Sequence, residues 1–121
     1  MQWIVLIGDE NFNLSSIKSI IHNDAVQSYG VTEISGRYCF DFGKDHIFYD
    51  FSNDIINDYT PEELLKIPFK NPMFIMMVYT SEERMRKVLQ QKNYLNNIYI
   101  DNDHGLIVPI SEFIKHGMPV S

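Results

Sequence analysis

Carboxylates and aromatic rings alternate between residues 41 and 59, and these residue types are suited to recognition. A set of acidic side chains steers a positively charged surface toward it, and aromatic rings anchor a bound partner. We therefore expect a basic protein partner to bind a face formed by Asp41, Phe48, Asp50, Asp54 and Asp58. The alternative is an ordinary solvated surface with a few half-buried rings.

A second set of polar residues follows segments that we expect to be strands. If these strands ran parallel, their carboxyl ends would meet at one edge of a sheet, where α/β proteins bind ligands. The alternative function is therefore an enzyme or sensor that binds a small molecule or a metal. Its pocket would be formed by Asp9, Tyr79, Thr80 and Asp101.

No motif in the chain indicates a cofactor or a metal centre. A phosphate cradle needs several glycines and free backbone donors, whereas Gly8 is followed by Asp9 and Glu10, which repel anions. The segment 101–105 has oxygen ligands at alternate positions, but its glycine is fifth, and a calcium loop needs glycine sixth. We interpret this segment as an Asx-type turn and expect neither cofactor nor metal.

Cys39 and His46 could in principle form a thiolate–imidazole pair, with Asp41 nearby. Neither a helix N-terminus nor a positive cluster is predicted to lower the pKa of the thiol, so we expect Cys39 to be a small buried apolar residue. We also expect His22 near the end of a helix, in a structural role. A protein without catalytic activity is therefore favoured over an enzyme.

The 121 residues carry a formal net charge of −6, which argues against binding to nucleic acid or to an anionic membrane. No stretch approaches the roughly 18 apolar residues of a membrane-spanning helix, and the first residues lack the features of a signal peptide. The single cysteine suits a reducing compartment. We expect a cytoplasmic protein, and its low alanine and arginine content is typical of an AT-rich bacterial genome.

Apolar periodicity and capping residues predict alternating strands and helices. Thr60, Pro61 and Glu63 mark one helix start, and Asn13 and Ser111 mark two others. The expected strands are 3–7, 26–34, 37–42, 46–51, 73–79, 98–100 and 106–109. The expected helices are 14–22, 61–67, one that is capped at Thr80 or Ser81 and points Met85, Val88 and Leu89 inward, and one or two helical turns that are capped by Ser111 and end at Gly117.

Segments 37–42 and 46–51 should pair as a hairpin, and the loop length decides which side chains share a face. An even number of loop residues collects the apolar side chains on one face, whereas an odd number mixes the two faces. The even register points inward Tyr38, Phe40, Phe42, Ile47, Tyr49 and Phe51. It leaves on the other face Arg37, Cys39, Asp41, Phe48 and Asp50.

The segments 73–79 and 98–100, joined by a helix, predict a right-handed parallel βαβ unit. We expect one domain over residues 1–121, with an α/β (mixed α+β) fold. It would be a single-layer mixed sheet with a β-hairpin insertion and three to four helices packed on it. The profile is typical of small acidic, non-catalytic binding modules, such as immunity proteins or adaptors that engage a basic protein. A homodimer through the exposed sheet face is a further alternative.

Overall fold

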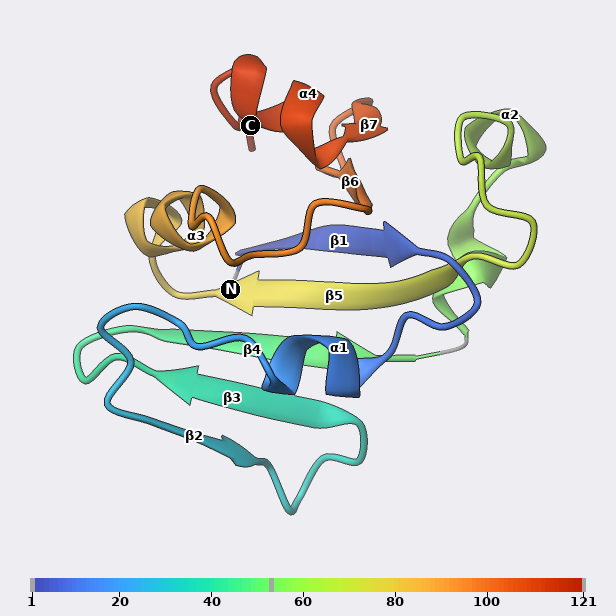
Figure 1. Cartoon of the computed structure of the whole chain (residues 1–121). Helices are drawn as coiled ribbons and strands as arrows, with labels where there is room; N and C mark the ends of the chain where they lie inside the picture. The colour runs from blue at the N-terminus through green and yellow to red at the C-terminus, as the bar shows by residue number, and fades with distance from the viewer. Residues whose placement is uncertain (1, 53, 121) are drawn as a thin grey trace.

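The computed structural model describes residues 2–52 and 54–120, in which seven strands form one sheet in the order β2-β3-β4-β5-β1-β6-β7 (Figure 1). The strands are β1 Gln2–Gly8, β2 Gln27–Gly30, β3 Arg37–Asp41, β4 His46–Phe51, β5 Met73–Tyr79, β6 Tyr99–Asp101 and β7 Ile107–Pro109. The helices are α1 Leu14–Lys18, α2 Pro61–Leu64, α3 Glu82–Leu89 and α4 Ile110–Lys115, and a 3-10 turn, η1, spans Ile55–Asp58.

Every neighbouring pair of strands is antiparallel, so the predicted mixed sheet and its parallel unit are wrong. The reason is that β1 lies between β5 and β6 and pairs with both: Ile4 is opposite Met77, and Leu6 is opposite Ile100. As a result β5 and β6 run in the same direction without pairing, because β1 separates them. The mixed α+β class itself is correct.

One face of the sheet is covered by α1, α3 and α4, which together bury the larger core. Ile17 of α1, Met85 of α3 and Phe113 of α4 are fully buried in this core. Figure 1 shows α1 lying across β3 and β4. We call this side of the sheet the helical face.

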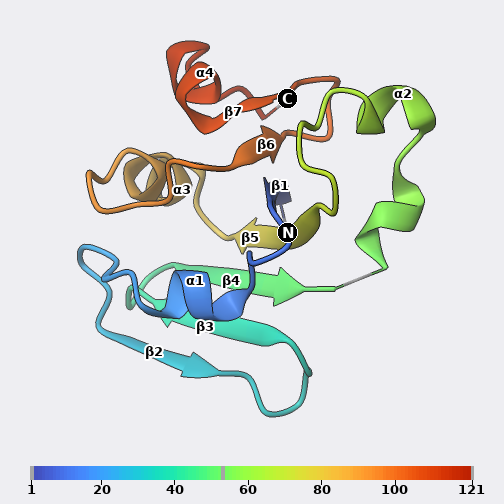
Figure 2. The same cartoon turned by 45° about the vertical axis from the view of Figure 1, so that its right-hand side comes forward.

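The opposite face carries a smaller core over only part of the sheet. Residues of η1, of α2 and of the segment after α2 cover Val5, Ile7 and Phe74, beside Ile107 at the edge. In Figure 2, α2 and α3 lie on opposite sides of β1. The predicted single layer is therefore wrong, because elements pack on both faces. None of the described helices is among the residues packed over β2, β3 and β4 on this second face.

The register of the β3–β4 hairpin is the predicted one, because four residues, 42–45, connect the strands. Arg37 lies opposite Asp50, and Cys39 lies opposite Phe48. Tyr38 and Tyr49 are also opposite each other, and their rings belong to the larger core. Polar residues of the hairpin consequently share the face that η1 and α2 leave open.

The predicted starts of the helices agree with the structure more often than the predicted ends do. Asn13 and Thr60 cap their helices, as expected; the capping box at Thr60 was predicted, and Asn13 forms one as well, with Ser16. However, α1 ends at Lys18 rather than near residue 22, and α4 begins directly after Pro109 rather than being capped by Ser111. Within the described ranges, no helix combines the length and apolarity needed to cross a membrane.

Candidate functional site

An apolar row crosses the uncovered part of the sheet, and we call this surface the open face. Strand pairing aligns five side chains from the edge strand inward, in the order Tyr29, Cys39, Phe48, Val78 and Trp3. The exposed fraction is 42% for Tyr29 and 40% for Trp3, whereas Cys39 is fully buried beneath its neighbours. The row therefore exposes aromatic rings to solvent, while the thiol beneath them is inaccessible.

An ion pair between Arg37 and Asp50 borders the row on one side. The guanidinium donates through Nε at 2.6 Å and through Nη2 at 2.7 Å to the two carboxylate oxygens. The hydrogen bonds to Asp50 raise the pKa of Arg37, and its guanidinium carbon lies 4.8 Å from the centre of the Phe48 ring. Asp50 thus neutralises a cation and fixes its position on the aromatic ring.

Asp41 borders the row on the other side and is also engaged within the chain. Its carboxylate accepts hydrogen bonds from the Gln27 side chain and the Gly43 amide, both at 2.8 Å, and these lower its pKa. His46 Nε2 lies 3.3 Å from it, and the His46 ring stacks on Phe48. Asp41 and Asp50, two of the four aspartates expected to meet a partner, therefore position the residues around Phe48.

An acidic cavity of about 190 Å³ lies at the end of the row, against Trp3. Its apolar wall includes Val5, Ile55 and Met76, and Tyr59 also lines it. Four carboxylates surround it, and none of the described lining residues is a cation: the carboxylates belong to Asp58, Glu63, Asp101 and Asp103. Asp58 and Asp101, expected in two different sites, therefore line one cavity.

Asp101 is held firmly in this cavity and is only 8% exposed. Its Oδ2 accepts a hydrogen bond of 2.5 Å from the Tyr59 hydroxyl, and its Oδ1 accepts one of 2.8 Å from the Asp103 amide. Burial, and then the hydrogen bond to Asp101, raise the pKa of Tyr59 well above its ordinary value. Tyr59 consequently stays a donor, and Asp101 keeps a fixed orientation.

Asp54 is exposed at the start of η1 and does not line the acidic cavity. Nor do the described residues contain a group of three or more histidine, cysteine or acidic side chains arranged to hold a metal ion.

The alternative pocket of Asp9, Tyr79, Thr80 and Asp101 is not assembled. Because β1 and β5 are antiparallel, Asp9 follows the end of β1 that lies beside the start of β5, far from Tyr79. Tyr79 is buried in the larger core, and the Thr80 hydroxyl accepts a hydrogen bond from the His46 amide. Asp101 belongs to the acidic cavity on the other face. The expected meeting of strand ends required parallel strands.

Cys39 is a buried residue of the open face, as predicted. Burial raises the pKa of its thiol, and the Tyr29 side chain acts in the opposite direction. His46 is instead engaged with Asp41. A thiolate–imidazole pair does not form in this hairpin.

A buried chain of hydrogen bonds on the helical face was not predicted. His22 Nδ1 lies 3.0 Å from the Ile20 carbonyl and must donate to it, so Nε2 accepts from Tyr49 OH at 2.7 Å. Tyr49 OH accepts in turn from Tyr94 OH at 2.9 Å. The inward register of Tyr49 was visible in the sequence, but the distance of 27 residues to His22 gave no signal.

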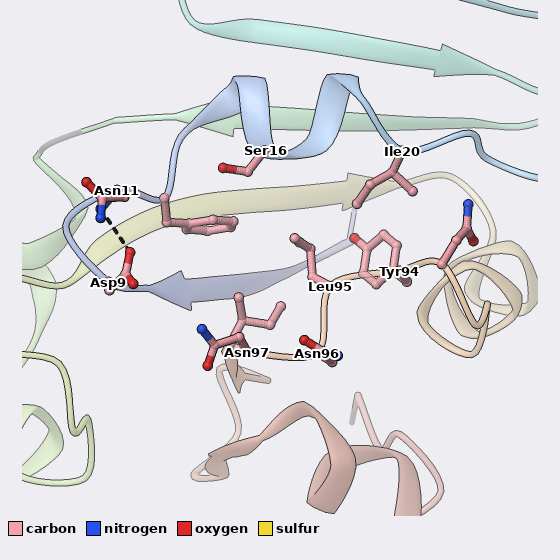
Figure 3. Close-up of a pocket in the computed structure, with 11 residues that line it drawn as sticks. Asp9, Asn11, Ser16, Ile20, Tyr94, Leu95, Asn96 and Asn97 are labelled. Atoms are coloured by element: carbon pink, nitrogen blue, oxygen red, sulfur yellow. Dashed lines mark hydrogen bonds between the residues drawn. The ribbon is translucent and has the colours of Figure 1, made fainter.

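A second cavity, of about 410 Å³, lies on the helical face between α1 and the segment 93–98 (Figure 3). Asp9, Asn11 and Ser16 line one side, and Asn96 and Asn97 line the other. Sequence reasoning missed this cavity because the Asn-rich stretch 93–97 has the composition of an ordinary loop.

Comparison with known proteins adds no relative to this description. No protein-family model, no curated protein and no solved structure matches the chain. The function must therefore be inferred from the geometry.

Proposed function

We propose that this chain is a small acidic, non-catalytic protein-binding module that engages a basic protein partner through its open face. The observation that carries the proposal is the uncovered row of aromatic rings that ends at the acidic cavity. In the cell, this module would act as an immunity-type or adaptor protein in the bacterial cytoplasm. A buried lone thiol is compatible with such a reducing compartment.

The aromatic rings supply the binding energy in this proposal. Tryptophan and tyrosine are enriched among residues whose truncation weakens binding most, especially where the surroundings are rigid. Trp3 and Tyr29 are each about two-fifths exposed, and Phe48 is held between the Arg37 guanidinium and the His46 ring. Binding would therefore bury large rings that are already ordered, which keeps the entropic cost low.

The charges supply selectivity for a basic surface. Asp41 and Asp50 have partners within the chain, so they contribute less free charge than the sequence suggested. The stronger negative field lies at the acidic cavity, where Asp58 and Asp101 face no cation among the described lining residues. Acidic groups beside an aromatic anchor attract a positively charged partner surface during the encounter, and they disfavour the binding of acidic proteins.

A cross-linking experiment tests the proposal. The purified protein is cross-linked in extracts of its source cells through a photoreactive group placed near Trp3, the partner is identified, and the two purified proteins are titrated. Because Trp3 is the only tryptophan in the chain, its emission reports directly on the open face. We expect the Trp3 spectrum to change on binding and the affinity to fall as salt rises.

Matched variants separate the open face from the rest of the surface. Trp3→Ala and Phe48→Ala should each weaken binding by about 2 kcal/mol, whereas Leu65→Ala, at an exposed apolar residue after α2, should have little effect. Asp58→Lys should weaken binding more than the control Asp9→Lys, because Asp9 lies on the helical face. An acidic partner, or a partner that binds the double variant Trp3→Ala/Phe48→Ala unchanged, would contradict the proposal.

A further inference from the structure

We propose that the cavity between α1 and the segment 93–98 binds a neutral, hydroxyl-rich small molecule, of the chemical class of a pyranose sugar. The cavity is on the helical face, so the inference does not depend on the partner proposed for the open face. Its volume of about 410 Å³ falls in the range of small-molecule sites.

Three exposed asparagine side chains at the rim of this cavity have amide groups available for a ligand. The side chains of Asn11, Asn96 and Asn97 line it, and none of the three makes a side-chain hydrogen bond within the described residues. Asn93 differs, because its amide donates to the Ile21 carbonyl and accepts from Gln91. Each free amide offers two donors and one acceptor. Hydroxyl groups, which both donate and accept, are the natural complement of such a set.

The electrostatics of the cavity favour an uncharged ligand over an anion. None of its described lining residues is lysine, arginine or histidine, and its one carboxylate is Asp9. Asp9 Oδ1 accepts a hydrogen bond of 2.9 Å from the backbone N–H of Asn11, while Oδ2 has no partner among the described residues. A free carboxylate oxygen accepts from ligand hydroxyls but repels phosphate and carboxylate groups.

The apolar wall of the cavity is rigid. Phe12 packs so closely on Gly8 that a Cβ added to that glycine would lie 2.5 Å from Phe12 Cβ. On the other side, Tyr94 is fixed by its hydrogen bond to Tyr49. Phe12, Tyr94 and Leu95 all line the cavity, and Figure 3 shows Tyr94 and Leu95 across it from Asp9 and Asn11. Such a surface can pack against the C–H face of a sugar ring while the amides meet its hydroxyls.

The test is a titration followed by nuclear magnetic resonance of the side-chain amide signals. The probes are D-glucose, D-galactose and D-mannose, each raised to about 50 mM because a ligand of this size binds with a dissociation constant on the order of millimolar. We expect at least one sugar to shift the amide signals of Asn11, Asn96 and Asn97. Glucose 6-phosphate should bind more weakly than glucose, and comparison with maltose shows whether the cavity takes a free sugar or the end of a glycan.

Variants decide whether the shifts arise in this cavity. Asn96→Ala/Asn97→Ala should weaken binding about tenfold, because two hydrogen-bonding groups are removed. Asn11→Ala gives a second disruption on the α1 side, and Asn57→Ala, at an exposed asparagine of η1, is the matched control. Three results would overturn the inference: no amide shift with any neutral sugar, tighter binding of glucose 6-phosphate or adenosine, or unchanged affinity in the double variant.

Discussion

His22 lies in the larger core with its ring stacked on Phe40 at 3.6 Å between centroids. Burial lowers its pKa from 6.5 to about 4, although the hydrogen bond to the Ile20 carbonyl acts in the opposite direction. In the folded protein the imidazole is therefore neutral at pH 7, and its Nε2 accepts a hydrogen bond from the Tyr49 hydroxyl. Protonation would place a second donor against that hydroxyl and break the chain of hydrogen bonds.

The lowered pKa makes the free energy of unfolding depend on pH in a defined window. Below pH 6.5 the unfolded chain binds a proton at His22 that the folded protein does not bind until about pH 4. Stability is therefore fully present above pH 6.5 and is lost as the pH falls toward 4. At 1.36 kcal/mol for each pKa unit, His22 should cost the fold about 2.5 kcal/mol of stability by pH 4.5.

Urea unfolding at a series of pH values, with Trp3 emission as the signal, measures this cost. The wild-type protein is compared with His22→Gln, which retains an acceptor for Tyr49 but does not titrate. The difference in unfolding free energy between the two should fall by about 2.5 kcal/mol from pH 7 to pH 4.5. His116→Gln, at an exposed residue after α4, is the control and should follow the wild type in parallel. Parallel curves for wild type and His22→Gln would refute the reasoning.

Three further substitutions should lower stability for separate reasons, each measured as a change in urea midpoint. Gly8→Ala places a Cβ 2.5 Å from Phe12 and should cost about 1–3 kcal/mol through overpacking. Arg84→Met removes the partner that donates to Asp45 at 2.9 Å, and the nearly buried carboxylate left behind should cost about 2–3 kcal/mol. Thr60→Ala removes the α2 capping box and should cost about 1 kcal/mol.

Controls for these substitutions come from similar residues in exposed settings. Lys87→Met breaks a solvent-exposed pair with Glu83 and should change stability by less than about 0.5 kcal/mol. Gly30→Ala meets open space around its added Cβ and should be milder than Gly8→Ala. Equal losses for Lys87→Met and Arg84→Met, or for the two glycine substitutions, would contradict the explanations based on burial and close contact.

The sequence predicted local features of the fold well because short-range physics determines them. The alternation in residues 37–51 and the even loop set the hairpin register, and Asn13 and Thr60 set two helix starts. The position of β1 could not be predicted in this way. A strand buried on both faces has the same apolar run beside parallel or antiparallel neighbours, so residues 3–7 do not show which strands they join.

Only the part of the candidate site that depends on local alternation of side chains could be predicted from the sequence. The alternation of side chains along the hairpin was enough to place Phe48 on the face that points away from the core. Its alignment with Trp3 arises only in the structure, because Val78 of β5 pairs with both residues. Trp3 was missed because it stands at the start of an apolar run. Asp58 and Asp101 meet in one cavity because η1 packs against the open side of β1 and β5, a long-range contact without a local sequence signal.

The interior position of β1 has a consequence for how the chain folds. This strand is synthesised before both of its neighbours, which are residues 73–79 and 99–101. At roughly 5–20 residues per second, the ribosome would leave β1 without a neighbour on either side for about 4–15 seconds. The apolar segment 4–7 must avoid aggregation over that interval. The centre of the sheet forms only after β5 and β6 have been made, and its pairing between residues distant in sequence slows folding.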